Sequence, residues 1–186
     1  MKSARTMKNY TLVAGITLLL AMSLANVVFA DSGARTYIWL AGAEPICTMI
    51  GPSACPDVAK AGNGDTVSIA GSGTFTIHPD LVTGSGTFIH KDSAGNVKAS
   101  GTWTATKLVS FVSYGSGSLQ GLPPSFEGGK AVIRIHASVG VDALLTVYCL
   151  LGSPPSGVDE GIRLNVQDII NFNVQGGGAT GFIRTA

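Results

Sequence analysis

The sequence is poor in charge, in histidine and in cysteine, and these shortages exclude several classes of function. Only 12% of the 186 residues are Asp, Glu, Lys or Arg, and the chain contains three histidines and three cysteines. After residue 30 the lysines and arginines stand singly along the chain rather than in clusters. Because a nucleic-acid-binding surface needs a concentration of basic side chains, we expect no nucleic-acid partner.

Motifs of enzymes and cofactor-binding proteins are also missing. The sequence has no phosphate-binding or dinucleotide-binding glycine loop placed where a strand would lead into a helix. The cysteines form no CxxC pair, so neither a zinc site nor thioredoxin-like chemistry has support. We therefore expect no metal and no cofactor. A non-catalytic function is favoured, and enzymatic activity stays open.

The longest apolar run lies at the N-terminus and predicts secretion. Three basic residues precede an uncharged run from about Leu12 to Phe29, and Ala30 then precedes the polar segment DSGAR. This is the pattern of a secretory signal peptide, residues 1–30, with cleavage before Asp31. An uncleaved anchor is the alternative, because the run approaches the roughly 20 residues that span a bilayer. We expect a secreted or extracytoplasmic protein, in a periplasm or at a cell surface, without a membrane span after cleavage.

Residues 31–186 are predicted to form a single domain rich in strands. Removal of residues 1–30 leaves 156 of the 186 residues, with nine basic and eleven acidic side chains, so the net charge is about −2. Twenty-four of the 25 glycines lie in this part, together with many Val, Ile and Thr residues. That composition favours strands and turns over helices.

Short apolar segments separated by turn residues predict about eight to ten antiparallel strands, beginning with TYIWLAG and ending with GFIRT. The expected fold class is all-β, either a β-sandwich or a barrel. Two longer interruptions are expected, a disulfide-tethered loop at 45–65 and a Gly- and Pro-rich loop at 115–130. A helical turn is expected at Asp57 to Ala61.

A repeated segment raises the question of a two-histidine metal site. GSGTF occurs twice between residues 71 and 88, and a histidine follows each copy. Side chains alternate along a strand, and the first copy has an extra threonine before its histidine. If Phe75 and Phe88 both face the core, His78 points outward and His90 inward. A shared metal is therefore disfavoured, and zinc or copper would also need a third ligand.

The best polar pair of the sequence is Arg134 with His136, because both lie on one face of the segment VIRIHAS. Apolar strands can line a cavity as well as fill one, so a ligand-binding interior is a reasonable hypothesis. Arg134 and His136 are its candidate polar anchors. Its candidate wall residues are aromatic: Phe88, Trp103, Phe111 and Tyr114.

The cysteines predict one disulfide. An oxidising compartment favours pairing, and Cys47 and Cys55 lie eight residues apart in one loop. Cys149 shares strand parity with Leu145 and Val147, so we interpret it as a buried thiol. An intermolecular bridge, or a bond from Cys149 to one loop cysteine, is the alternative.

Three functions remain open from the sequence. The favoured one is binding of a small apolar ligand by a secreted β-domain. The alternative is a structural or self-associating cell-surface protein with a surface partner protein, because low charge and exposed strand edges promote association. The third is an enzyme that uses His136, Arg134 and Tyr114.

Overall fold

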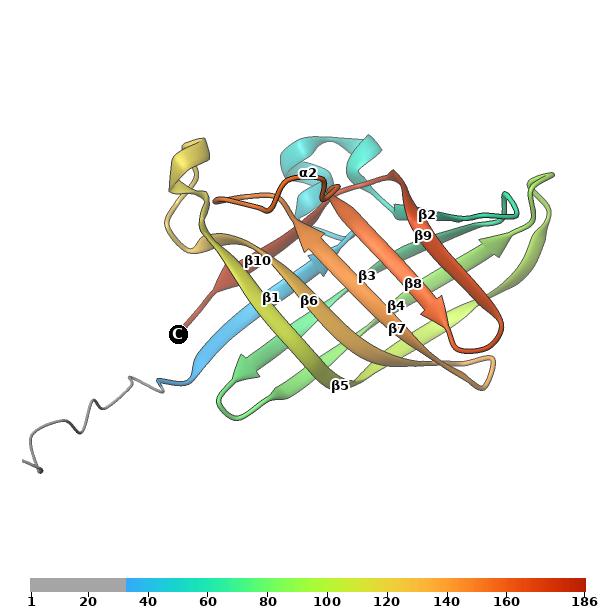
Figure 1. Cartoon of the computed structure of the whole chain (residues 1–186), viewed down its shortest axis with the longest axis horizontal. Coiled ribbons are helices and arrows are strands. Elements are labelled where there is room, and N and C mark those ends of the chain that lie inside the picture. Colours follow the sequence, from blue (N-terminus) through green and yellow to red (C-terminus); the bar gives the residue numbers. More distant parts are fainter. Residues whose placement is uncertain (1–32) are drawn as a thin grey trace, which may run out of the picture. The chain divides into compact units, whose positions relative to one another are not determined.

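One antiparallel sheet of ten strands makes up most of the described chain (Figure 1). The computed structural model describes residues 33–186, so the predicted signal peptide lies outside the described residues. The strands are β1 (Arg35–Ala41), β2 (Asp57–Ala61), β3 (Thr66–Ile77), β4 (Leu81–Lys91), β5 (Val97–Ser116), β6 (Phe126–Ala137), β7 (Val141–Cys149), β8 (Gly161–Val166), β9 (Ile170–Gly177) and β10 (Thr180–Arg184). The helical segments are α2 (Ile46–Ile50), η1 (Pro52–Ala54) and η2 (Gly117–Gln120). The all-β prediction is confirmed.

The sheet closes on itself. Its strand order is β1-β10-β6-β5-β4-β3-β2-β9-β8-β7, and β6 also pairs with β7. This last pairing joins the strands from β2 to β9 into a ring. Beside it, β1 and β10 pair with each other and connect the second half of β3 to the start of β6. Of the two predicted architectures this is the barrel, in which closure leaves the ring strands without a free edge.

Two buried indole rings pack against the backbone of the two GSG segments, residues 71–73 and 84–86. The two copies pair with each other across β3 and β4. A Cβ added to Gly71 or Gly86 would lie 2.2 or 2.6 Å from a ring carbon of Trp103, and one on Gly84 would lie 2.6 Å from Trp39. The two rings stack with centroids 5.7 Å apart, and each indole N–H donates a hydrogen bond to a carbonyl of β4. The repeat therefore serves packing.

The remaining interior is filled by apolar side chains from all around the ring. Phe75 and Phe111 pack with centroids 4.8 Å apart, and Phe182 of β10 contacts both rings at their edges. A second, smaller apolar cluster lies on the other face of β1, where Leu40 packs with Ile46 of α2. The two clusters lie on opposite faces of β1 because alternate residues of a strand point to opposite sides.

The expected helical turn at Asp57 to Ala61 is wrong, since these residues form β2 between β3 and β9. Asp57, Ala59 and Ala61 are buried and the residues between them are more exposed, which is the period of a strand. Alanine and lysine favour helices, but pairing with strands on both sides outweighs this weak local preference. The helical structure within the predicted 45–65 loop consists of α2 and η1 instead.

Candidate ligand-binding site

An apolar pocket of about 400 Å³ lies where α2 meets the sheet. Its walls come from α2, from the segment that leads into β6, from the end of β7 and from the start of β10. Apolar wall residues include Leu40, Ile46, Met49, Leu122, Phe126 and Leu151. The polar side chains among the lining residues are Glu160, Thr180 and the thiol of Cys149. A mostly apolar cavity with a few polar groups is the usual composition of a small-molecule site.

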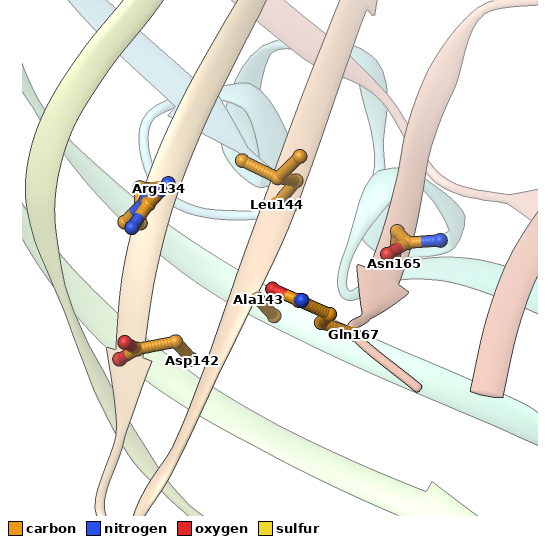
Figure 2. Close-up of a pocket in the computed structure, with 6 residues that line it drawn as sticks. All are labelled: Arg134, Asp142, Ala143, Leu144, Asn165 and Gln167. Carbon is orange, nitrogen blue, oxygen red and sulfur yellow. The ribbon is translucent and has the colours of Figure 1, made fainter. Parts of the chain in front are cut away.

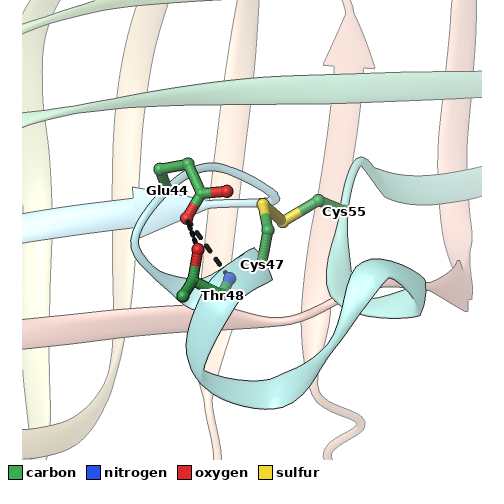
Figure 3. The surroundings of a disulfide bond; sticks show 4 residues. All are labelled: Glu44, Cys47, Thr48 and Cys55. Carbon is green, nitrogen blue, oxygen red and sulfur yellow. Dashed lines mark hydrogen bonds between the residues drawn. A yellow bond between two sulfur atoms is a disulfide. The ribbon is translucent and has the colours of Figure 1, made fainter.

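The disulfide between Cys47 and Cys55 is confirmed, and it ties α2 to the segment just before β2 (Figure 3). Next to it, Glu44 accepts hydrogen bonds from the backbone N–H and the hydroxyl of Thr48, at 3.2 and 2.7 Å. These links hold the first turn of α2, so Ile46 stays buried against β1. A covalent bond therefore links the helix that forms one wall of the pocket to the chain that leads into β2.

Two apolar side chains of α2 remain exposed at the edge of this pocket. Met49 is 56% exposed and Ile50 is 65% exposed, and both line the pocket. Exposed apolar side chains that gather around a cavity favour contact with an apolar molecule.

Glu160 joins two strand ends that do not pair with each other. Its Oε2 accepts a hydrogen bond from the N–H of Leu150, just after β7, at 2.7 Å. Its Oε1 accepts from the N–H and the hydroxyl of Thr180, at the start of β10, at 3.0 and 2.8 Å. The side chain of Glu160 thus connects β7 and β10, which form no backbone hydrogen bonds with each other. The pocket lies at this gap between the two strands.

A second carboxyl, Asp57, lies buried near Glu160. Neither of its carboxylate oxygens makes a hydrogen bond of normal geometry. Burial, and next the charge of Glu160, raise the pKa of Asp57 to about 7, although the side chain of Gln175 and the N–H of Val58 offset part of this rise. Burial also raises the pKa of Glu160, against its hydrogen bonds to Leu150 and Thr180. The two acids therefore hold protons more tightly than exposed carboxyls do.

The predicted interior position of Cys149 is confirmed, since its thiol is free and buried. Burial raises its pKa to about 12, with a smaller contribution from the charge of Glu160. The thiolate is the nucleophilic form of cysteine, so this thiol is unreactive near neutral pH.

The four aromatic candidates from the sequence lie away from this pocket. Trp103 belongs to the packed interior, and Phe88 and Phe111 pack against it. Tyr114 is partly buried near the end of β5, and burial raises the pKa of its hydroxyl. None of these four lines the pocket beneath α2.

Arg134 and His136 lie together on the exposed face of β6, as strand parity predicted. The Nδ1 of His136 lies 2.7 Å from Oδ1 of Asp142. Arg134 and Asp142 border an open depression of about 200 Å³ together with Asn165 and Gln167 (Figure 2). The polar anchors expected from the sequence are thus brought together, but outside the apolar pocket.

Glu160 is the functional candidate that sequence reasoning missed. The pair Asp159-Glu160 in GVDEG has the composition of a solvated turn, and nothing local distinguishes the two acids. Glu160 acquires its hydrogen-bond partners, Leu150 and Thr180, only when the ends of β7 and β10 come together in the fold. No signal in the sequence could have identified it.

The histidines do not share a site. His78 is exposed in the turn after β3, whereas His90 lies inward on β4, as predicted. The Nε2 of His90 lies 2.8 Å from Oδ2 of Asp65, and Lys98 also contacts this carboxylate. The hydrogen bond with His90, more than any other contact, lowers the pKa of Asp65. Within residues 33–186 no group of three His, Cys, Asp or Glu side chains is placed to hold a metal ion.

Among the described residues no helix is both long and apolar enough to cross a membrane. Comparison with protein-family models found no match to the chain. Comparisons with curated proteins and with solved structures likewise gave no match. The geometry of the pocket is therefore the basis on which a function can be argued.

Proposed function

We propose that this protein is a non-catalytic binding domain that takes a small apolar ligand in the pocket beneath α2. The observation that carries the proposal is an apolar cavity of about 400 Å³ with one partly buried carboxyl, Glu160, in its wall. Cavities of roughly 300 to 1,000 Å³ with an apolar lining and few polar groups are typical of small-molecule sites.

Binding is favoured over catalysis because the polar groups of the pocket are poorly suited to chemistry. The high pKa of Cys149 keeps its thiol protonated, and both oxygens of Glu160 accept hydrogen bonds from the protein itself. A nucleophile needs an ionised or activated group within reach of the substrate. These polar groups instead orient a ligand or hold the wall.

Secretion belongs to the same proposal. Disulfides persist in oxidising compartments, and Cys47 and Cys55 are bonded. Together with the apolar N-terminal run, this supports an extracytoplasmic site of action. A carrier or sensor of an apolar molecule outside the cytoplasm is consistent with both features.

The proposal is tested by titrating the protein with Nile red, a neutral apolar dye whose fluorescence rises in apolar surroundings. Ile50→Asp places a charge at the exposed edge of the pocket and should weaken binding by about tenfold, since a charge disfavours an apolar contact. Val139→Asp, an equally simple change at an exposed residue between β6 and β7, should have no effect. Absent dye binding, or equal loss in both variants, would overturn the proposal.

The alternative is self-association through the exposed apolar edge formed by Met49 and Ile50. A closed sheet has fewer exposed strand edges than the sequence suggested. Self-association would therefore use α2 rather than a strand edge. Sedimentation at rising protein concentration distinguishes the two. A dimer that Ile50→Asp dissociates, with no dye binding by the monomer, would favour self-association.

A further inference from the structure

We infer that the pocket selects apolar molecules that carry a protonated amine, with Glu160 as the counter-ion. The inference rests on the proposed function and adds the charge of the ligand to it. Three features of the described residues support it: the sign of the charges near the pocket, the absence of a protein cation beside them, and the position of Glu160.

Among the described residues, the charged residue type that lines this pocket is acidic. Glu160 is the sole Asp, Glu, Lys, Arg or His among the lining residues. Asp57 lies close enough for the charge of Glu160 to raise its pKa. A negatively charged ligand group would therefore meet repulsion at Glu160 from one or two carboxylates.

Neither acid is paired with a cation from the part of the chain that the structure describes. The ion pairs formed within residues 33–186 involve Asp65, Glu127 and Asp142, and none includes Asp57 or Glu160. An unpaired buried charge is costly, and an opposite charge brought to it in a poorly solvated site is strongly attracted. A ligand ammonium would supply the missing positive charge.

Glu160 offers a charged contact within an otherwise largely apolar wall. Its carboxyl bonds Thr180, and the apolar lining residues include Ile46 and Phe126. An amphiphile can place its ammonium at Glu160 and its apolar body against these side chains. A charge-assisted hydrogen bond is stronger than one between neutral groups, so an amine is preferred over an alcohol of the same shape.

The test uses three ligands with one apolar body: decylamine, decanol and decanoate, measured by calorimetry at pH 7.5 with the mature protein. We expect decylamine to bind about tenfold more tightly than decanol, and decanoate to bind most weakly. In Glu160→Gln the ratio of the affinities for decylamine and decanol should fall from about ten to about one. Asp159→Asn, at the exposed neighbouring acid, should leave the order unchanged.

The outcomes separate this inference from the proposed function. Equal binding of the three ligands, or tightest binding of decanoate, overturns the inference and leaves a general apolar pocket. Binding of none overturns both. If Glu160→Gln does not fold, the order of the three ligands with the unaltered protein still decides, with Asp159→Asn as its control.

Discussion

Two acidic sites of this domain, Glu127 and the pair Asp57 and Glu160, differ in their partners. Glu127 accepts hydrogen bonds from Tyr37 and Ser113, both at 3.1 Å, and its Oε1 lies 3.0 Å from Nη1 of Arg184. Within residues 33–186 neither Asp57 nor Glu160 has such a cation, and Asp57 also lacks normal hydrogen bonds. Removing one partner of a buried acid that the protein itself neutralises is strongly destabilising, whereas an unneutralised acid costs stability and is available to a ligand or a proton.

The largest effect is expected at the neutralised site. Glu127→Leu leaves the buried hydroxyl of Tyr37 without its acceptor and Arg184 without its partner, and should lower the free energy of unfolding by about 3 kcal/mol. Urea denaturation of the two proteins measures the difference. A loss below about 1 kcal/mol would mean that Glu127 is not the stabilising acid that the comparison requires.

The disulfide is expected to affect both the stability of the fold and the pocket. Replacing both Cys47 and Cys55 by serine should lower the free energy of unfolding by about 2 to 3 kcal/mol, because the unfolded chain gains freedom. Binding of Nile red should weaken as well, since α2 loses its covalent link to the segment before β2. If dye affinity stays unchanged while stability falls, the disulfide does not hold the pocket wall.

A substitution of Asp57 is expected to raise the free energy of unfolding, in contrast to the two changes above. Asp57→Asn removes a buried ionisable group without a proper partner and should raise the free energy of unfolding by on the order of 2 kcal/mol at pH 8. Asp142→Asn, at an exposed acid, is the matched control and should change little. If Asp57→Asn lowers the free energy of unfolding at this pH, Asp57 does not carry an uncompensated charge in the folded protein.

The pH dependence follows from the same pKa. Asp57 has a pKa of about 7 in the folded state against 3.8 for the free group, so between these values the folded protein binds the extra proton. Its contribution to stability is therefore greatest below about pH 4 and falls as the pH rises toward 7. Unfolding free energies measured from pH 4 to 8 should show this decline in the unaltered protein and a flatter profile in Asp57→Asn. Glu160, whose pKa is also raised, should leave part of the slope in place.

The smallest effect is expected outside both sites. His136 and Asp142 form an exposed pair, with side chains 53% and 62% accessible. His136→Ala should change the free energy of unfolding by less than about 0.5 kcal/mol, because water and salt screen such pairs. Dye binding beneath α2 should also stay unchanged. A clear loss of binding would move the ligand site to the outer face of β6.

Much of the fold was predictable because strand signals are local. The alternation of VIRIHAS correctly separated Ile133 and Ile135 from Arg134 and His136, and the same reasoning placed His90 inward. Asp57 to Ala61 was mispredicted because its alanines and lysine favour a helix. The pairing of this segment with β3 and β9 depends on residues far away in the chain.

The ligand site was less predictable than the fold. The sequence supplied the disulfide, since two cysteines in one loop lie within reach of each other. It offered Arg134 and His136 as anchors, and the structure places them on the outer surface. Aromatic residues proposed as cavity walls, such as Trp103, pack against other aromatic rings instead. Chemical type alone does not say whether an apolar side chain fills a space or lines one.

By itself, the sequence determined the all-β class and the order of most strands along the chain, and it favoured the Cys47–Cys55 bond over the alternatives with Cys149, because each depends on residues close together in the chain. Only the tertiary structure decided that the sheet closes, that β7 and β10 leave a gap, and that Glu160 fills it beside Asp57. Burial and charge at these acids arise from segments distant in sequence. The interaction between these two acids exists only in the folded chain, where those segments lie close together.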